Sequence, residues 1–404
     1  MPSASLARRA AHLSSVMPAS NPDDKIAFDS GHAFPGVLPD LTSEAAAALS
    51  RFRAETLQYA PRAGLPELRE WIAEHMRADG SAVTADNVLV TNGAKHALEL
   101  VCRLTLDEGD AVVVTSPTYF SAIPIIRSFG ATFIEVPQDT DGMDVDALAH
   151  LLDRASAAAR LPKFIYNVPD FHNPTGVTMP LERRRALVEL AARHRVLLVE
   201  DSPYRKVRFE GQPVPSLKSL DTDGTAVIQL GTFSKLLAPG LRVGWAAGAA
   251  DVLARMAQLK SDAGSCPLTQ RVILEFCAAG RLDTHTARVQ EAYRAHRDRM
   301  VRAMQRDLPE VSFQVPNGGY YLWLSLPPGV DGDELARRAS DAGVIVIAGS
   351  RFFALGAGEQ RGRFIRVAFS HANLDEIDEG VRRLAAACHS LGTGTGAAAG
   401  AAAV

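Results

Sequence analysis

The sequence predicts an α/β protein: a large domain with a mostly parallel, seven-stranded sheet between helices, and a smaller α/β domain. From about residue 43 to residue 280, short apolar runs alternate with helical segments. The runs are nearly continuous in Val, Ile and Leu, as strands buried on both faces must be. After Thr286 the pattern changes to a long charged helix followed by short strands and helices. Alternation of this length favours parallel strands joined by crossover helices.

Seven apolar runs are the predicted strands of the large sheet. They cover residues 88–91, 111–116, 131–136, 164–168, 196–200, 226–231 and 244–248. Between two of them, the segment "LERRRALVELAARHR" places Leu187, Leu190 and Ala191 on one apolar stripe and its arginines on the other side. This pattern is typical of a helix packed on a sheet, and Pro180 just ahead of it suits the first turn of a helix.

The smaller domain is predicted from the charged helix "RVQEAYRAHRDRMVRAMQRDL", the segment "GGYYLWLSLP", a helix near "ELARRASDAG" and the strands "VIVIAG" and "RFIRVAFS". The first 45 or so residues are expected to join it in space. The predicted division is therefore an N-terminal arm at 1–25, a small domain at 26–45 with 287–390, a large domain at 46–286, and a disordered low-complexity tail at 391–404.

Composition excludes several classes of protein. The chain has 404 residues, 47% of them apolar, and a net charge of −3, so nothing in it calls for nucleic acid. Its four cysteines lie far apart without a CxxC pair, which indicates free thiols in a reducing, cytoplasmic compartment and no metal site. No apolar run approaches the roughly 20 residues that cross a bilayer. The first residues resemble an organellar presequence, but an amphipathic arm is favoured because no cleavage signal follows.

A lysine at a strand-to-loop junction carries the functional prediction. Lys235 lies in "GTFSKLLAPGLRVGW", downstream of an "HNPTG" loop with Asn173 and of the strand "VLLVEDSPY" with Asp201. A lysine amine can hold the aldehyde of pyridoxal phosphate as a Schiff base and later move the substrate's α-proton. A carboxylate beside the ring nitrogen keeps that nitrogen protonated, and strand ends are where open α/β sheets place ligand groups. The pattern therefore predicts pyridoxal phosphate as the cofactor.

A phosphate site is predicted from two segments. In "TNGAKHALEL" a strand, a Gly turn and a helix start follow one another, so the N–H groups of Ala94 and Lys95 can face a phosphate. Thr232 and Ser234 add hydroxyl groups beside the lysine, and Arg242 adds a guanidinium. The side chain of Lys95 has two interpretations, a phosphate contact or an ordinary surface charge.

The ring and the substrate need further contacts. Tyr119 in "SPTYF" follows a strand and offers a ring to stack on the pyridine, while Asn173 and Tyr204 can hydrogen-bond its phenolic oxygen. Arg366 in "RFIRVAF" is the candidate clamp for a substrate carboxylate, since arginine binds carboxylates in a bidentate manner. A structural ion pair is the alternative for Arg366.

These motifs and their order resemble the class I/II aminotransferase family of fold-type-I pyridoxal-phosphate enzymes, especially the 2-aminoadipate and kynurenine aminotransferase branch. The resemblance runs from about Ile26 to Leu384 and rests on "QYAPRAGLPELREWIA", "SPTYF", "HNPTG", "EDSPY", "GTFSK", "PGLRVGW" and "RFIRVAF". It implies transfer of the α-amino group of an L-amino acid to a 2-oxo acid by a ping-pong mechanism through pyridoxamine phosphate. It also implies a homodimer with shared active sites.

The resemblance assigns a role to each candidate residue. Lys235 is implied as the Schiff-base lysine and catalytic base, Asp201 as the partner of the ring nitrogen, and Tyr119 as the stacking ring. The implied cofactor contacts are Ala94, Lys95, Tyr119, Asn173, Asp201, Tyr204, Thr232, Ser234, Lys235, Arg242 and, reaching the neighbouring subunit's cofactor, Tyr59. The implied substrate contacts are Arg366, Gly31 and Asn173.

Two departures from the family pattern stand out. Gly93-Ala94-Lys95 replaces a turn that usually reads Gly-Ser-Gln or similar, and His172 stands where Gln or Asn commonly precedes "NPTG".

The sequence is also compatible with two rival functions. One is a β/γ-lyase or cyclase on the same fold. The other is a cofactor-binding regulatory module, which would need a DNA-binding region ahead of Ile26.

Overall fold

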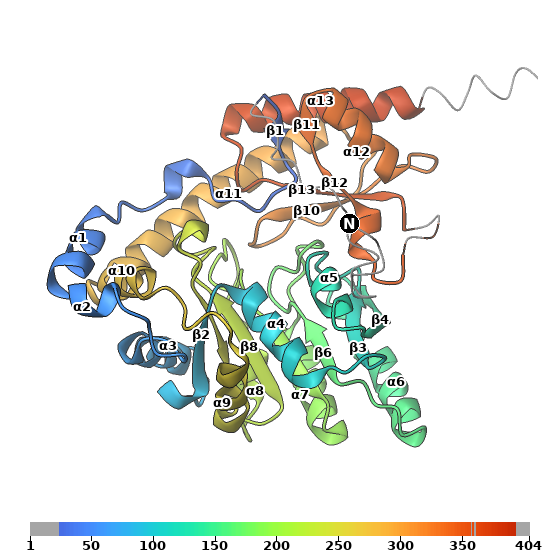
Figure 1. Cartoon of the computed structure of the whole chain (residues 1–404). Helices are drawn as coiled ribbons and strands as arrows, with labels where there is room; N and C mark the ends of the chain where they lie inside the picture. The colour runs from blue at the N-terminus through green and yellow to red at the C-terminus, as the bar shows by residue number, and fades with distance from the viewer. Residues whose placement is uncertain (1–23, 357, 359–360, 393–404) are drawn as a thin grey trace, which may run out of the picture.

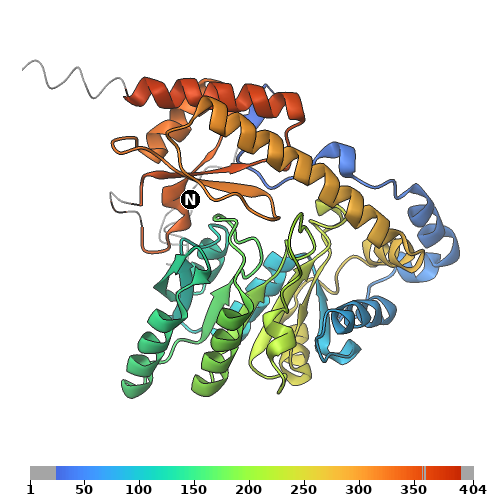
Figure 2. The same cartoon turned by 180° about the vertical axis from the view of Figure 1, so that it is seen from behind.

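The computed structural model describes residues 24–356, 358 and 361–392. An eight-stranded sheet with helices on both faces forms the larger part, and a three-stranded sheet with long helices lies above it, past one end of its strands (Figure 1). The view from behind in Figure 2 shows the same two parts, one above the other. The predicted α/β class, with a mostly parallel main sheet, is confirmed.

The large sheet has the strand order β2-β9-β8-β7-β6-β3-β4-β5. Strands β8, β7, β6, β3 and β4 are mutually parallel, β9 is antiparallel to both β8 and β2, and β5 is antiparallel to β4. All seven predicted strands are present; the eighth, β5, has only two residues and leaves no apolar run in the sequence. The bounds are β2 Val88–Thr91, β3 Ala111–Ser116, β4 Thr132–Asp139, β5 Gly142–Met143, β6 Phe164–Asn167, β7 Leu197–Asp201, β8 Val227–Thr232 and β9 Gly244–Ala247.

Helices cover both faces of this sheet because successive strand side chains point to opposite sides. Val113 and Leu198 pack with α6, α7 and α8, whereas Val112 and Val199 pack with α4, α5 and α9. Helices α3 and α10 cover the edge formed by β2 and β9. The bounds are α3 Pro66–Ala78, α4 Ala94–Thr105, α5 Ala122–Arg127, α6 Val145–Ala157, α7 Leu181–His194, α8 Leu217–Leu220, α9 Ala250–Leu259 and α10 Pro267–Ala278.

The smaller part is built on the antiparallel sheet β10-β13-β12 and on a two-stranded pair of β1 with β11. The single strand predicted at 344–349 is in fact two, because Val344–Ile345 pairs with β1 while Ile347–Ala348 pairs with β13. Helices α11 and α13 lie side by side over this part (Figures 1 and 2). The bounds are β1 Ile26–Ala27, α11 Arg281–Asp307, β10 Tyr321–Ser325, α12 Gly332–Asp341, β11 Val344–Ile345, β12 Ile347–Ala348, β13 Phe364–Ala368 and α13 Leu374–Gly392.

Two short helices, α1 at Thr42–Arg51 and α2 at Arg53–Thr56, lie beside α10 at one end of the molecule (Figure 1). The predicted arm before residue 24 and most of the predicted tail, from residue 393, lie outside the described residues. Residues 391 and 392, the first two of the predicted tail, belong to α13. Among the described residues, no helix is long and apolar enough to cross a membrane.

Candidate active site

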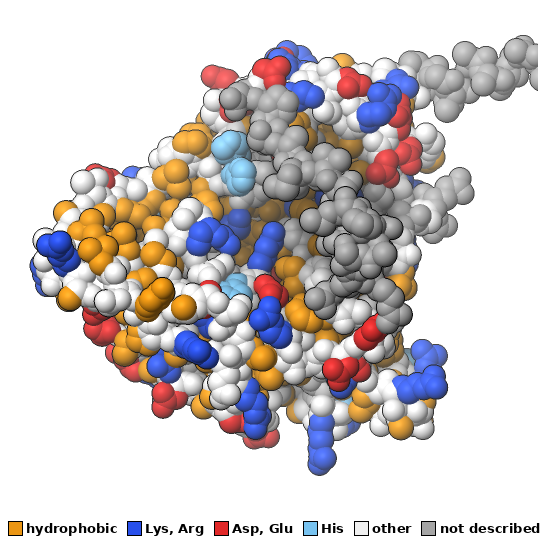
Figure 3. All heavy atoms as spheres, in the orientation of Figure 1, with side chains coloured by type: hydrophobic (Ala, Val, Ile, Leu, Met, Phe, Trp, Pro, Cys, Tyr) orange, Lys and Arg blue, Asp and Glu red, His pale blue; other side chains and the backbone are white. Residues whose placement is uncertain are grey.

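A cavity of about 790 Å³ lies between the two sheets, at the carboxyl ends of β7 and β8. Basic side chains gather near the middle of the face shown in Figure 3. Of the predicted site residues, Tyr59 alone does not line the cavity. The predicted residues that line it are Gly31, Ala94, Lys95, Tyr119, Asn173, Asp201, Tyr204, Thr232, Ser234, Lys235, Arg242 and Arg366. Segments far apart in the sequence therefore meet at one place.

Lys235 follows the end of β8, and its Nζ donates a hydrogen bond to the carbonyl of Gly31 at 2.7 Å. Burial, and then the positive charges of Arg366, Lys95 and Arg242, lower the pKa of this amine to about 8. A lysine with that pKa is about one-tenth neutral near neutral pH, whereas an ordinary lysine is on the order of 0.03% neutral. Lys235 is thus prepared to act as a nucleophile and a base.

Asp201 ends β7 and is buried. Its Oδ2 accepts a hydrogen bond from the hydroxyl of Tyr166 at 2.6 Å, while its Oδ1 has no hydrogen-bond partner among the described residues. Burial raises the pKa of Asp201 to about 6, although the Tyr166 hydrogen bond and Lys95 oppose the rise. A buried carboxylate oxygen without a partner is costly, so Oδ1 is suited to a cationic N–H group from a ligand.

The phosphate end of the cavity is formed by the start of α4 and the loop after β8. The first N–H groups of a helix have no partner within the helix and attract anions. Gly93 has a φ of +84°, and a Cβ there would lie 2.9 Å from Nη2 of Arg242, so the turn before α4 needs glycine. The Thr232 hydroxyl donates to the Ser234 hydroxyl at 2.9 Å. These donors suit a phosphate dianion.

Aromatic rings form the walls of the cavity. Tyr119 and Tyr204 line it, and the hydroxyl of Tyr204 lies 3.1 Å from that of Tyr321. Lys95 also lines it, with Nζ 5.9 Å from the centre of the Tyr119 ring. Burial and then the charge of Arg242 lower the pKa of Lys95. Its amine therefore faces the cavity that the predicted phosphate would enter.

Arg366 lies on β13, almost fully buried, with its guanidinium 4.1 Å from the centre of the Tyr321 ring. Its Nη1 donates to Oδ1 of Asn173 at 3.0 Å, and its Nη2 donates to the carbonyl of Asp29. Its Nε has no hydrogen-bond partner among the described residues, and neither does the amide nitrogen of Asn173. The two acceptors, an amide oxygen and a backbone carbonyl, are neutral groups. The positive charge of Arg366 is therefore available to an anion in the cavity.

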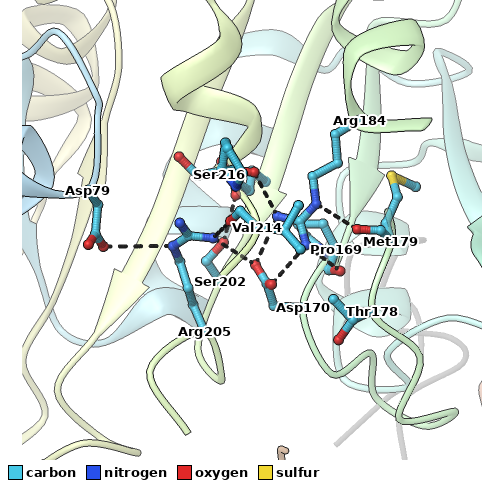
Figure 4. A network of polar contacts seen from close by, with 12 residues as sticks. Asp79, Pro169, Asp170, Thr178, Met179, Arg184, Ser202, Arg205, Val214 and Ser216 are labelled. Atoms are coloured by element: carbon cyan, nitrogen blue, oxygen red, sulfur yellow. Dashed lines mark hydrogen bonds and ion pairs between the residues drawn. The ribbon is translucent and has the colours of Figure 1, made fainter. Parts of the chain in front are cut away.

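Asp170, in the loop that also carries Asn173, forms a buried ion pair with Arg184 (Figure 4). Arg184 of α7 donates to both oxygens of Asp170, at 2.8 and 3.1 Å, and to the carbonyl of Met179 at 2.8 Å. Burial alone would raise the pKa of Asp170, but Arg184 and then Arg205 hold it below its usual value. Because breaking a buried pair leaves an uncompensated charge, this network holds the loop in place.

His172 is part of the same loop and does not line the cavity. Its Nε2 lies 3.2 Å from the hydroxyl of Thr115, and its Nδ1 lies 3.0 Å from that of Thr175. Complete burial lowers the pKa of His172 to about 3, so the ring stays neutral near neutral pH. The structure therefore gives His172 a fixed hydrogen-bonding role within the loop.

Two tyrosines near the site were not predicted from the sequence. Tyr166 contacts Asp201, and Tyr321 contacts Tyr204 and the Arg366 guanidinium. Tyr321 could have been suspected, because it begins the strand "YLWLS" opposite the strand of Arg366. For Tyr166 the available signal was a polar hydroxyl in a four-residue strand that is buried throughout.

Gly31 lies against both the lysine and Tyr321. A Cβ at this position would lie 2.2 Å from the Tyr321 hydroxyl oxygen and 3.4 Å from Nζ of Lys235. We therefore expect Gly31→Ala to push both groups from their positions and to lower kcat/KM by about tenfold, since small misplacements of reacting groups are costly. Steady-state kinetics measure this, with Gly240→Ala, which meets no atom within 4 Å, as the control. Equal activity of the Gly31 variant and the unmodified enzyme would contradict the expectation.

The comparisons with known proteins agree with this geometry. The family model "Aminotransferase class I and II" matches residues 24–384. The chain belongs to this family. A 2-aminoadipate transaminase of Thermus thermophilus is 36% identical over 373 residues, which cover 91% of the chain and 90% of that protein.

Two solved structures are similar along nearly their whole length. One is a kynurenine aminotransferase of Pyrococcus horikoshii in complex with PMP, with a TM-score of 0.89, 32% identity and coverage of 96% and 97% of the two chains. The other is an α-aminoadipate aminotransferase of Thermus thermophilus complexed with N-(5'-phosphopyridoxyl)-L-leucine, with a TM-score of 0.85, 34% identity and coverage of 92% and 94%. The fold of this aminotransferase is therefore fold type I, as predicted.

The cofactor of this aminotransferase is pyridoxal phosphate, and its reaction is amino-group transfer, as predicted. The residues present fit that cofactor. The buried Oδ1 of Asp201 and the amide nitrogen of Asn173 have no hydrogen-bond partner in the described part of the chain, and both residues line the cavity. The turn at Gly93 leaves room for Arg242 beside the start of α4. The alternative of a lyase or cyclase is not favoured by these relatives.

Proposed function

We propose a role in transamination for each of the predicted residues that line the cavity. Asp201 holds a proton on the ring nitrogen, while Asn173 and Tyr204 donate hydrogen bonds to the phenolic oxygen. Tyr119 stacks on the ring. The N–H groups of Ala94 and Lys95, the hydroxyls of Thr232 and Ser234 and the guanidinium of Arg242 bind the phosphate. Pyridoxal phosphate, when bound, supplies an electron sink for the substrate's α-carbon.

Lys235 is proposed as the group that removes the α-proton from the amino acid and later returns it. Its lowered pKa supports this role, because its amine needs little energy to become neutral near neutral pH. Arg366 binds the substrate α-carboxylate, and Gly31 leaves space for the substrate beside Lys235. The observation that carries the proposal is the convergence, around one cavity, of a lysine of lowered pKa, a buried arginine and a buried carboxylate oxygen that has no partner among the residues described.

The donor is proposed to be an L-amino acid and the acceptor a 2-oxo acid, in two separable half-reactions. The enzyme loaded with cofactor is mixed with one amino acid at a time, without an acceptor, and the released 2-oxo acid is quantified. We expect at most one equivalent per site, and turnover only after a second 2-oxo acid is added. Release of many equivalents of 2-oxo acid together with a leaving group, and without an acceptor, would identify a lyase instead.

A homodimer is proposed from the surface around α1 and α2. Leu49 and Leu57 are exposed there, and Tyr59, which was predicted to reach the neighbouring subunit's cofactor, is 84% exposed. Hydrophobic side chains gather over the end of the molecule formed by α1, α2 and α10 (Figure 3). Exposed apolar patches of this kind mark association sites. A Tyr59 that reaches a partner's cavity accounts for its exposure and for its absence from the cavity of its own chain.

The dimer proposal predicts complementation between a variant with weakened cofactor binding and an inactive variant, assayed at limiting pyridoxal phosphate. Tyr59→Ala is expected to weaken binding of pyridoxal phosphate by about tenfold through loss of one hydrogen bond to a charged group. Mixed dimers of Tyr59→Ala with an inactive Lys235 variant would contain one site that keeps both residues, so activity should rise on mixing. Sedimentation of the unmodified protein as a monomer, or no recovery on mixing, would contradict the proposal.

The cytoplasm is proposed as the compartment on the basis of the thiols. All four cysteines are free, and Cys266 is exposed. An exposed thiol without a disulfide partner suits a reducing compartment. Fractionation of source cells should place the protein with cytoplasmic markers, and recovery from an organelle or an oxidising compartment would contradict this.

We also propose that the boundary between the large and the small domain lies at residues 286/287. This boundary falls within α11, so that this helix would connect the two domains.

A further inference from the structure

Tyr166 is a fully buried tyrosine on β6, the strand next to the one that ends in Asp201. It is level with Val199 on β7, so its ring reaches past that residue to the aspartate two positions further along. Its hydroxyl donates to Oδ2 of Asp201 at 2.6 Å, in the short range of charge-assisted hydrogen bonds. Tyr166 does not line the cavity. Tyr166 therefore contacts Asp201 from the side that faces away from the cavity.

The contact divides the two oxygens of Asp201 between protein and cavity. Oδ2 is taken by Tyr166, whereas Oδ1 is buried and has no hydrogen-bond partner among the described residues. Without the tyrosine hydroxyl both oxygens would compete for one ligand group, and the carboxylate could rotate about its χ2 angle. With it, one oxygen alone remains for a donor in the cavity.

The same hydrogen bond also favours the ionised form of Asp201. Burial opposes ionisation of this carboxylate, and Glu200 on the same strand opposes it too, whereas Tyr166 and Lys95 of α4 favour it. Tyr119 also faces it. Burial raises the pKa of Tyr166 well above 10, so its hydroxyl remains a donor at every working pH. The tyrosine is thus a permanent neutral donor to a carboxylate that burial would otherwise tend to protonate.

We propose that Tyr166 is a positioning residue that keeps Asp201 ionised and turns its free Oδ1 toward the ring nitrogen of bound pyridoxal phosphate. The inference rests on the proposed role of Asp201. A purely structural alternative exists, because Tyr166 also belongs to the apolar cluster between the sheet and α4, α5 and α9. A positioning role depends on the hydroxyl group of Tyr166, whereas a packing role depends on its ring.

Tyr166→Phe tests the inference, since it keeps the ring and removes the hydroxyl. We expect the Kd of pyridoxal phosphate, measured by equilibrium dialysis of the full chain, to rise by about tenfold or more near neutral pH, as loss of one hydrogen bond to a charged group predicts. The variant's Asp201 should gain a proton more readily, so the acid-side loss of binding should begin at a higher pH. The ratio of the two Kd values should therefore be largest on the acid side.

Tyr293→Phe is the matched control. Tyr293 is also fully buried, its hydroxyl accepts a hydrogen bond from the backbone N–H of Phe34 at 3.1 Å, and it does not line the cavity. We expect its Kd and its pH profile to equal those of the unmodified protein. A pH-independent rise in Kd for Tyr166→Phe, matched by Tyr293→Phe, would show a packing role and overturn the inference.

Asp201→Asn separates a failure of this inference from a failure of the proposed function. If Asp201→Asn binds the cofactor normally, the role of Asp201 is wrong. If Asp201→Asn weakens binding and Tyr166→Phe does not, the role of Tyr166 alone is wrong. Because Tyr166 is proposed to act through Asp201, the double variant should bind no more weakly than Asp201→Asn. Fully additive losses would contradict this coupling.

Discussion

Lys235→Ala is expected to lower kcat by about 10⁴-fold or more while leaving the chain folded. General acid–base catalysis alone contributes about 10²- to 10⁴-fold, and this variant also loses the amine that binds the cofactor covalently. Lys235 combines both tasks, because its Nζ lies in the cavity between Gly31 and the ring of Tyr320. Steady-state kinetics measure the loss, and absorbance of the purified protein measures the covalently bound cofactor.

The fold should survive this substitution for an electrostatic reason. Burial and three nearby positive charges already oppose the protonated form of Lys235. A group whose pKa is lowered in the folded state makes the folded state less stable below that pKa, so removing the amine relieves this cost near neutral pH. The loss of one hydrogen bond to the carbonyl of Gly31 is about 1 kcal/mol in the opposite direction. Circular dichroism and thermal unfolding should therefore change little.

Lys163→Ala is the matched control for Lys235→Ala. Lys163 is exposed and forms an ion pair of 3.4 Å with Asp110, at the opposite end of the parallel strands from the cavity. The same side chain is thus removed, but no contact to the cavity is lost. Full activity in Lys235→Ala would refute the role of this residue, and a similar loss in Lys163→Ala would show that the assay reports folding instead of catalysis.

The main sheet was predictable because its strands are buried on both faces. Such strands leave short, nearly continuous apolar runs, and the helices between them leave stripes such as that of Leu187 and Leu190. The run at 344–349 shows the limit of this signal. Both halves are buried, but one half pairs with β1 and the other with β13, and an apolar run does not reveal that it changes partner between Ile345 and Ile347.

The candidate residues were predictable where a polar group follows a strand end, as Asp201 follows the apolar part of β7. Contacts between distant segments were not. Arg366 meets Asn173 across 193 positions, and Tyr204 meets Tyr321 across 117. Tyr166 lies within a strand and looks like a core residue until its neighbour on β7 is known. Local sequence shows which residues have suitable chemistry, whereas the register of the strands decides which of them touch.

Arg366→Lys is the second substitution with a large expected effect, a fall in kcat/KM of about 100-fold or more. The guanidinium is fixed by Asn173, by the carbonyl of Asp29 and by the ring of Tyr321. Lysine keeps the charge but cannot form two parallel hydrogen bonds to a carboxylate. It also lacks the planar guanidinium that contacts Asn173 and the carbonyl of Asp29. Hydrogen bonds to charged groups contribute about 1.5–3 kcal/mol each, so loss of even one accounts for about tenfold and loss of two for the full effect.

The reason for the loss can be isolated with a pair of substrates. An α-amino acid and the amine that lacks its carboxylate differ only in the group that Arg366 is proposed to bind. We expect Arg366→Lys to remove most of the unmodified enzyme's preference for the amino acid and to leave the slow reaction of the amine little changed. Arg363→Lys, next to β13 with an exposed side chain bonded to Ser325, should keep the preference. An equal loss with both substrates would mean that Arg366 supports the fold of the cavity and does not bind the carboxylate.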